Sequence, residues 1–212
     1  MRITKIEPQK RQKNRSSVYL DDVFAFGIDD FDLLRLKLSV GLDISEERLS
    51  EIRETVLLSS AKNYGMKLCA ARSYTKAGLK RKMTEKGFGE WEIGLTISFL
   101  EEYRLLDDEE YARRFINDAV HLKGYGKFRI QNDLKEKGIE KNTIEKIFAE
   151  FNFGEMEEET LLALAKKKLA GDFSFENKMK TKRYLAARGF SFDAIDRAVY
   201  KVAGGGEEWS EC

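Results

Sequence analysis

Four consecutive acidic residues, Asp107 to Glu110, are the first candidate for chemistry, because clustered carboxylates can hold Mg²⁺. A hydrolytic metal site also needs acidic or histidine ligands from elsewhere in the chain. His121 is the single histidine of the 212 residues, and no second acidic motif completes the run. Asp107 and Glu110 instead have the spacing of an acidic capping box. We therefore expect a helix to begin here, without a metal.

The other candidates for catalysis also favour structural roles. Cys69 lies between Leu68 and Ala70 and predicts a packed side chain rather than a nucleophile. His121 lies near the predicted end of a helix, where it suits the helix dipole. Gly124–Lys127 lacks the full phosphate-loop pattern and predicts a turn between helices. The sequence thus predicts a protein that is not an enzyme and that needs no cofactor or metal.

Clustered basic residues are the stronger functional signal. The whole chain has 38 basic and 37 acidic residues, so an electrostatic partner must meet a local patch. One basic stretch runs from Lys62 to Lys86 and a second from Lys166 to Arg188. They predict a track for phosphates or for an acidic protein groove, although a solvated face explains them equally well.

Two tyrosines, Tyr74 and Tyr125, flank this basic track. Their rings could stack on bases of a nucleic acid or could pack at the start of a helix, and the sequence favours neither role. The predicted partner-binding residues are Arg72, Tyr74, Lys76, Lys80, Arg81, Lys82, Tyr125, Lys127, Arg129, Lys178, Lys182 and Arg183.

An internal repeat positions these residues. Gly87, Gly138 and Gly189 are each 51 residues apart, and each follows a similar segment. The register extends to flanking apolar columns, which include Met83, Leu134 and Leu185 before the glycine and Ile93, Ile144 and Ile195 after it. The columns have helical spacing, so each unit predicts three helices with the glycine at the end of the second. Small units of this kind share buried surface with their neighbours.

The sequence therefore predicts a mainly α-helical protein, an elongated tandem array of three three-helix repeats with a small strand-containing N-terminal module. The expected divisions are an N-terminal module at 1–60, repeats at 61–107, 108–153 and 154–203, and a flexible tail at 204–212. In the N-terminal module we expect a strand near 2–7 and a hairpin that turns at Asp21-Asp22. A short helix near 29–36 follows, and a second helix should run from an N-cap at Ser45 to about Ser60.

Cellular location follows from what the sequence lacks. The first residues have no apolar stretch typical of a signal peptide, and no apolar run is long enough to cross a membrane. Cys69 and Cys212 are too few to staple the chain and predict free thiols in a reducing compartment. We expect a cytoplasmic monomer.

Several segments resemble the RecX family of recombinase regulators. They are Ala71–Tyr74, Leu106–Phe115, Lys123–Lys127 and Leu134–Ile139. The family usually has a Glu-Leu pair on the second helix of its first repeat, where this chain has Gly78-Leu79. The match covers about 61–203, together with a strand-rich N-terminal extension that part of the family has.

The resemblance implies a non-enzymatic protein that binds RecA and the RecA–single-stranded DNA filament. It implies suppression of ATP hydrolysis, strand exchange and coprotease activity, and a helical array could lie in the groove of such a filament. A direct nucleic-acid-binding protein, which uses the same basic helices on the phosphate backbone, is the alternative. A helical scaffold for another protein is a third interpretation.

Overall fold

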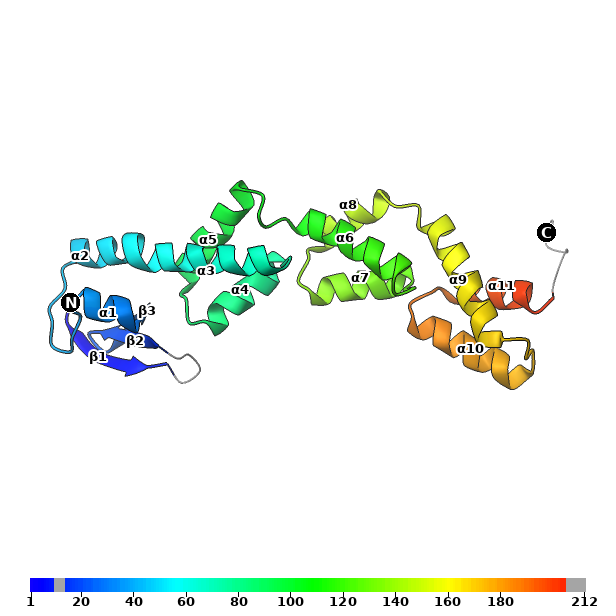
Figure 1. Ribbon diagram of the computed structural model, residues 1–212, viewed down its shortest axis with the longest axis horizontal. Coiled ribbons are helices and arrows are strands. Elements are labelled where there is room, and N and C mark those ends of the chain that lie inside the picture. Colours follow the sequence, from blue (N-terminus) through cyan, green and yellow to red (C-terminus); the bar gives the residue numbers. More distant parts are fainter. Residues whose placement is uncertain (10–13, 205–212) are drawn as a thin grey trace. The chain divides into compact units, whose positions relative to one another are not determined.

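The computed structural model describes residues 1–9 and 14–204 (Figure 1). The contacts within the chain divide it after Asp107 into two units. The first unit holds a three-stranded sheet and three-helix repeat 1, and the second holds repeats 2 and 3. The predicted fold class, mainly helical repeats after a small strand-containing module, is confirmed. Cys212 and all but Gly204 of the predicted tail lie outside the described residues.

The N-terminal sheet is antiparallel, with strand order β1-β2-β3. Its strands are β1 (Ile3–Pro8), β2 (Arg15–Leu20) and β3 (Val23–Asp29). Asp21 and Asp22 have φ of 47° and 67°, the left-handed conformation that a tight two-residue hairpin requires. The predicted hairpin around Asp21-Asp22 is therefore confirmed.

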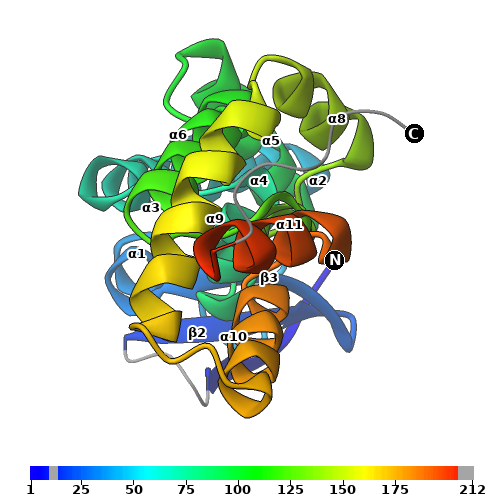
Figure 2. The same ribbon diagram turned by 90° about the vertical axis from the view of Figure 1, so that its right-hand side faces the viewer.

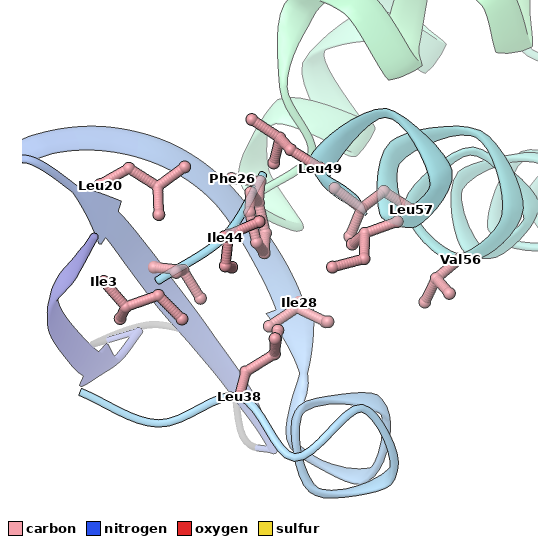
Figure 3. Close-up of a cluster of buried hydrophobic side chains, with 11 residues drawn as sticks. Ile3, Leu20, Phe26, Ile28, Leu38, Ile44, Leu49, Val56 and Leu57 are labelled. Carbon is pink, nitrogen blue, oxygen red and sulfur yellow. The ribbon is translucent and has the colours of Figure 1, made fainter. Parts of the chain in front are cut away.

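A hydrophobic core joins this sheet to the helix that begins at Glu46. Ile3, Phe26 and Ile28 of the sheet are at most 2% exposed, and they pack with residues such as Leu49 and Leu57 (Figure 3). The short helix α1 (Asp30–Arg35) leads to the loop before α2 (Glu46–Glu51). The Ser45 hydroxyl accepts a hydrogen bond from the Arg48 amide at 3.1 Å and caps α2, as predicted.

The helix that begins at Glu46 does not end near Ser60, so that prediction was wrong. α2 continues through a π-helical turn, η1 (Ile52–Leu57), into α3 (Leu58–Ala71) without a break. The physical reason is that residues of this one continuous helix are buried in two separate hydrophobic cores. Its Ile52 packs in the core of the sheet, whereas Ala61 packs in the core of the first repeat.

The repeats follow the predicted register closely. Their first helices are α3, α6 (Asp108–His121) and α9 (Phe153–Leu169), and their second helices are α4 (Lys76–Glu85), α7 (Lys127–Glu136) and α10 (Phe175–Ala187). The third helices are α5 (Glu90–Glu102), α8 (Lys141–Ala149) and α11 (Phe192–Val202). The second helices end, and the third helices begin, at positions 51 residues apart. α10 departs from the repeat by starting about one turn early, at Phe175.

Each repeat has its own core, built from the predicted columns. Met83, Leu134 and Leu185 are 0% exposed, and the equivalent isoleucines 93, 144 and 195 are at most 1% exposed. In the third repeat α11 packs against both α9 and α10; these three helices face the viewer in Figure 2. Within the second unit α9 also contacts α6, so repeats 2 and 3 share a packed interface. The elongated arrangement of all three repeats and the five divisions stay predictions.

Candidate partner-binding surface

A glycine turn fixes the orientation of the second helix in every repeat. Gly87, Gly138 and Gly189 have φ of +85°, +80° and +86°, a conformation that glycine adopts without a steric penalty. In the first repeat the Phe88 amide donates to the Met83 carbonyl at 3.1 Å, which is the Schellman pattern of a helix end. Because Met83 and Phe88 are both buried, the turn decides which face of the helix points outward.

The predicted lysines of α4 have carboxylate partners. The Nζ–carboxylate distances are 2.5 Å for Lys76–Glu101, 2.7 Å for Lys80–Glu90 and 2.6 Å for Lys82–Glu85. The local field of α4 is therefore weaker than its lysine count indicates. All six side chains are more than a third exposed, and exposed ion pairs of this kind contribute only about 0–1 kcal/mol to stability. A phosphate or carboxylate of a partner can therefore take the place of the glutamate in each pair.

Two arginines present unpaired charge at the same position of two repeats. Arg81 on α4 and Arg183 on α10 are exposed, and within the described part of the chain neither forms an ion pair. Arg183 Nε donates to the Met179 carbonyl at 3.3 Å. Of the other predicted residues of α10, Lys182 pairs with Asp196 at 2.7 Å and Lys178 is half-buried.

Arginine side chains cover both predicted tyrosines. The Arg72 guanidinium lies 4.6 Å from the Tyr74 ring centroid, and that of Arg129 lies 3.9 Å from the Tyr125 ring centroid. Both rings also pack against the apolar core of their own repeat. This geometry favours the packing interpretation of the tyrosines over stacking on bases.

The start of α7 joins repeat 2 to repeat 3. Gly126 N donates to the Arg188 carbonyl at 2.8 Å, Phe128 N to the Gly189 carbonyl at 3.1 Å, and Arg129 Nη1 to the Ala187 carbonyl at 3.2 Å. The Lys127 amide donates to the Glu157 carboxylate of α9, and burial raises the pKa of Glu157. Tyr125, Lys127 and Arg129 therefore lie at a joint between repeats.

Glycine is required on both sides of this joint. A Cβ atom on Gly126 would lie 2.5 Å from the Gly189 carbonyl oxygen, and one on Gly189 would lie 2.3 Å from the Arg129 backbone nitrogen. Arg188 also donates from Nη1 to the Gly124 carbonyl at 3.2 Å. Sequence reasoning missed Arg188 in this role, because its partners are more than sixty residues away along the chain.

The glycine turn of repeat 1 makes a similar contact with the N-terminal sheet. Arg15, which is 2% exposed, donates from Nη2 to the Gly27 carbonyl at 2.9 Å and the Gly87 carbonyl at 3.4 Å. Its guanidinium also lies 4.2 Å from the Phe88 ring centroid and 3.1 Å from Asp29 Oδ1. Burial lowers the pKa of Arg15, and Asp29 partly offsets this effect. In both units, then, the preceding module contacts the repeat at its glycine turn.

The acidic run Asp107–Glu110 leads into α6, as predicted, and its glutamates bind basic side chains. Glu109 lies 2.5 Å from Lys146 and 3.2 Å from Arg113, and Arg113 lies 2.7 Å from Glu150. The hydrogen bond from Lys146 lowers the pKa of Glu109, and that from Arg113 lowers the pKa of Glu150. No group of three potential metal ligands occurs among residues 1–9 and 14–204.

The other candidates for chemistry also have structural surroundings. Cys69 packs half-buried against the core of repeat 1, and burial raises the pKa of its thiol, which disfavours the reactive thiolate. His121 is the exposed last residue of α6, and Gly124–Lys127 connects α6 to α7. In the described part of the chain no helix has the length and apolar character needed to cross a bilayer.

Comparison with known proteins gives consistent matches along the chain. Residues 1–45 match the family model of the regulatory protein RecX N-terminal domain, and residues 107–146 and 155–199 match those of the second and third RecX three-helix domains. A regulatory protein RecX of Clostridioides difficile is 32% identical over 203 residues, which cover 94% of this chain and 95% of the relative. One of Clostridium botulinum is 31% identical, with coverage of 93% and 94%.

Solved structures show the same fold. A crystal structure of regulatory protein RecX has a TM-score of 0.64 at 24% identity and covers 97% of this chain and 99% of its own. RecX from Lactobacillus salivarius has a TM-score of 0.63 at 23% identity, with coverage of 69% and 96%.

Proposed function

Because the chain belongs to the RecX family of regulatory proteins, we propose that it is a non-enzymatic negative regulator of RecA. It binds RecA and the RecA–single-stranded DNA filament in the cytoplasm, and it inhibits ATP hydrolysis, strand exchange and coprotease activity in recombination and DNA repair. The observation that carries this proposal is the match to RecX regulatory proteins over nearly the whole chain. The family models describe a regulatory protein and name no catalytic activity.

We place the partner along the outward faces of the second helices. The glycine turns hold these helices in the same orientation within each repeat and leave their basic residues at the surface. In this proposal the array lies in the groove of the filament, where it faces acidic protein or DNA and blocks strand uptake or access of substrate. The facing residues are Arg72, Lys76, Lys80, Arg81, Lys82, Lys178, Lys182 and Arg183.

Of the other four predicted residues, Tyr74 packs against the core of repeat 1 beneath Arg72, and the three from repeat 2 act through the joint between repeats. Tyr125, Lys127 and Arg129 hold repeat 2 against repeat 3, so that α7 and α10 keep a fixed separation. Their substitution should impair binding by loosening the joint rather than by removing a contact with the partner.

Charge reversal on α4 tests the placement. The variant Lys80→Glu/Arg81→Glu/Lys82→Glu should bind the RecA–single-stranded DNA filament much more weakly, and the dependence of its affinity on salt should be flatter. The matched control reverses three exposed charges on first and third helices, Arg114→Glu/Lys141→Glu/Arg197→Glu, and should bind nearly as well as the wild type. Equal affinity of the α4 variant and the wild type would exclude this placement.

Direct binding to nucleic acid is the second candidate, and it is favoured by Arg81 and Arg183, which are exposed and form no ion pair with any residue that the structure describes. On naked single-stranded DNA each neutralised phosphate adds about 0.7 to the slope of log affinity against log salt. A slope of several units, with no gain in affinity when RecA is added, would support this candidate over the first.

A further inference from the structure

An open pocket of about 420 Å³ lies in repeat 3, and the proposed function does not use it. Its lining comes from α9, the loop that follows α9 and the end of α11: Lys166, Leu169, Gly171, Phe173 and Val202. Leu169 is 1% exposed, whereas Phe173 is 43% exposed. The pocket therefore combines an apolar lining with a lysine.

The loop that forms one side of the pocket is fixed by hydrogen bonds. α9 ends in two consecutive left-handed residues, Ala170 and Gly171, which reverse the chain. Asn177 Nδ2 then donates to the Leu169 carbonyl at 3.1 Å and to the Asp172 carbonyl at 2.8 Å. These bonds hold Phe173 near the end of α9, so the pocket is formed before any ligand enters.

Positive charge collects beside the pocket. Lys166, Lys167 and Lys168 occupy the last turn of α9 and are exposed. Lys166 forms no ion pair with any residue that the structure describes. An apolar lining beside exposed lysines suits an aromatic side chain that has acidic neighbours, because one ligand can then satisfy both features.

We propose that the segment 205–212 of this same chain occupies the pocket, with Trp209 against the apolar lining. The segment has the sequence GGEEWSEC, so Glu207, Glu208 and Glu211 accompany the tryptophan and complement the lysines of α9. It follows almost directly from Val202, which itself lines the pocket. Trp209 is seven residues beyond Val202, and an extended chain of that length spans up to about 23 Å, which is enough to turn back and enter.

Because the segment and the pocket belong to the same chain, a weak contact between them is sufficient for docking. A short covalent tether gives an effective concentration on the order of millimolar, so docking does not require an extensive interface. A docked segment would place carboxylates over Lys166 and its neighbours and reduce the basic surface of repeat 3. If the proposed function holds, this contact would lower the affinity of repeat 3 for its acidic partner.

Tryptophan fluorescence of the full chain tests the docking without RecA or DNA, so its outcome is independent of the proposed function. The chain has two tryptophans, and Trp91→Phe leaves Trp209 as the only one. Trp91 is 46% exposed, so its replacement should leave the fold intact. In this background we expect a blue-shifted Trp209 emission, protection from acrylamide quenching and no dependence on protein concentration.

Two substitutions in the pocket should release the tryptophan. Lys166→Glu and Phe173→Ala, each added to Trp91→Phe, should shift the emission to the red and raise the quenching constant towards that of free tryptophan. Lys135→Glu, an equal charge change on α7, is the control and should change neither. A Trp209 emission like that of free tryptophan in the parent variant, or one that the pocket substitutions leave unchanged, would overturn the proposal. A shift that grows with protein concentration would also overturn it, because it would indicate a second copy as the occupant.

Discussion

Single residues at the glycine turns connect segments that are far apart in the sequence. Gly126 and Gly189 let two backbones approach where any side chain would collide, and Arg188 donates to a carbonyl on the opposite side of the joint. Arg15 has the corresponding role between the sheet and repeat 1. Stability of each unit should therefore depend strongly on these few positions.

Gly126→Ala should destabilise the second unit. Gly126 has φ of −86°, which alanine tolerates, so the cost comes from the Cβ atom that would lie 2.5 Å from the Gly189 carbonyl oxygen. Overpacking of this kind costs about 1–3 kcal/mol, measurable as the free energy of unfolding in urea. The control Gly154→Ala, in the first turn of α9, meets only Asn152 Oδ1 at 3.6 Å and should be neutral or stabilising by up to about 1 kcal/mol. Equal stability of the two variants would refute the close approach at the joint.

Arg15→Lys should destabilise the first unit although it retains the positive charge. Lysine cannot reproduce the fork that reaches Gly27, Gly87 and Asp29 together, and buried acceptors that lose a donor cost about 1–3 kcal/mol. Arg48→Lys, at an exposed position on α2, should change the unfolding free energy by no more than about 0.5 kcal/mol. Thermal denaturation followed by circular dichroism compares the two, and a wild-type melting temperature for Arg15→Lys would contradict the assigned role.

At the scale of elements, the repeat period predicted the helices well, because glycine at a left-handed helix end and the buried columns around it recur in every unit. The repeat period did not predict two features of the structure. The helix expected to end near Ser60 continues to Ala71, since its two halves are buried in different cores. The ion pairs of Lys76 and Lys80 join α4 to α5, and one sequence does not reveal which acid lies opposite which lysine. Residue types thus predicted the basic helices, but only the packing shows which cations are unpaired.

The ion pair between Arg113 of α6 and Glu150, the residue that follows α8, should make the stability of repeat 2 depend on pH. The pKa of Glu150 is lowered by the hydrogen bond from Arg113, so its stabilising effect is complete above the unfolded-state pKa of about 4.3 and is lost as the pH falls through the folded-state value. Glu150→Gln should therefore melt at a lower temperature than the wild type at pH 7, and the difference should vanish in acid.

Glu136→Gln is the control, because Glu136 on α7 is exposed and has no ion pair within the described part of the chain. It should melt like the wild type at both pH values. A Glu150→Gln difference that stayed constant between pH 7 and pH 3 would show that the carboxylate charge does not contribute.

At the scale of the whole molecule, the chain consists of two units that are each built around glycine-turn joints. The first combines the sheet with repeat 1, and the second combines repeats 2 and 3. Tandem repeats of this kind present equivalent helices in series, which suits a partner that is itself built from repeated protomers. The sequence resemblance to RecX is confirmed by the comparisons, whereas a filament as the partner stays a prediction.

Steady-state ATP hydrolysis by RecA on single-stranded DNA shows whether this chain regulates RecA. Titration with the wild-type protein should abolish hydrolysis, and the Lys80→Glu/Arg81→Glu/Lys82→Glu variant should need a much higher concentration. Loss well below one molecule per RecA would indicate capping of filament ends, whereas loss near equal amounts would indicate coating of the groove. Unchanged hydrolysis in the presence of excess protein that binds naked DNA tightly would contradict regulation of RecA and favour a direct nucleic-acid-binding protein.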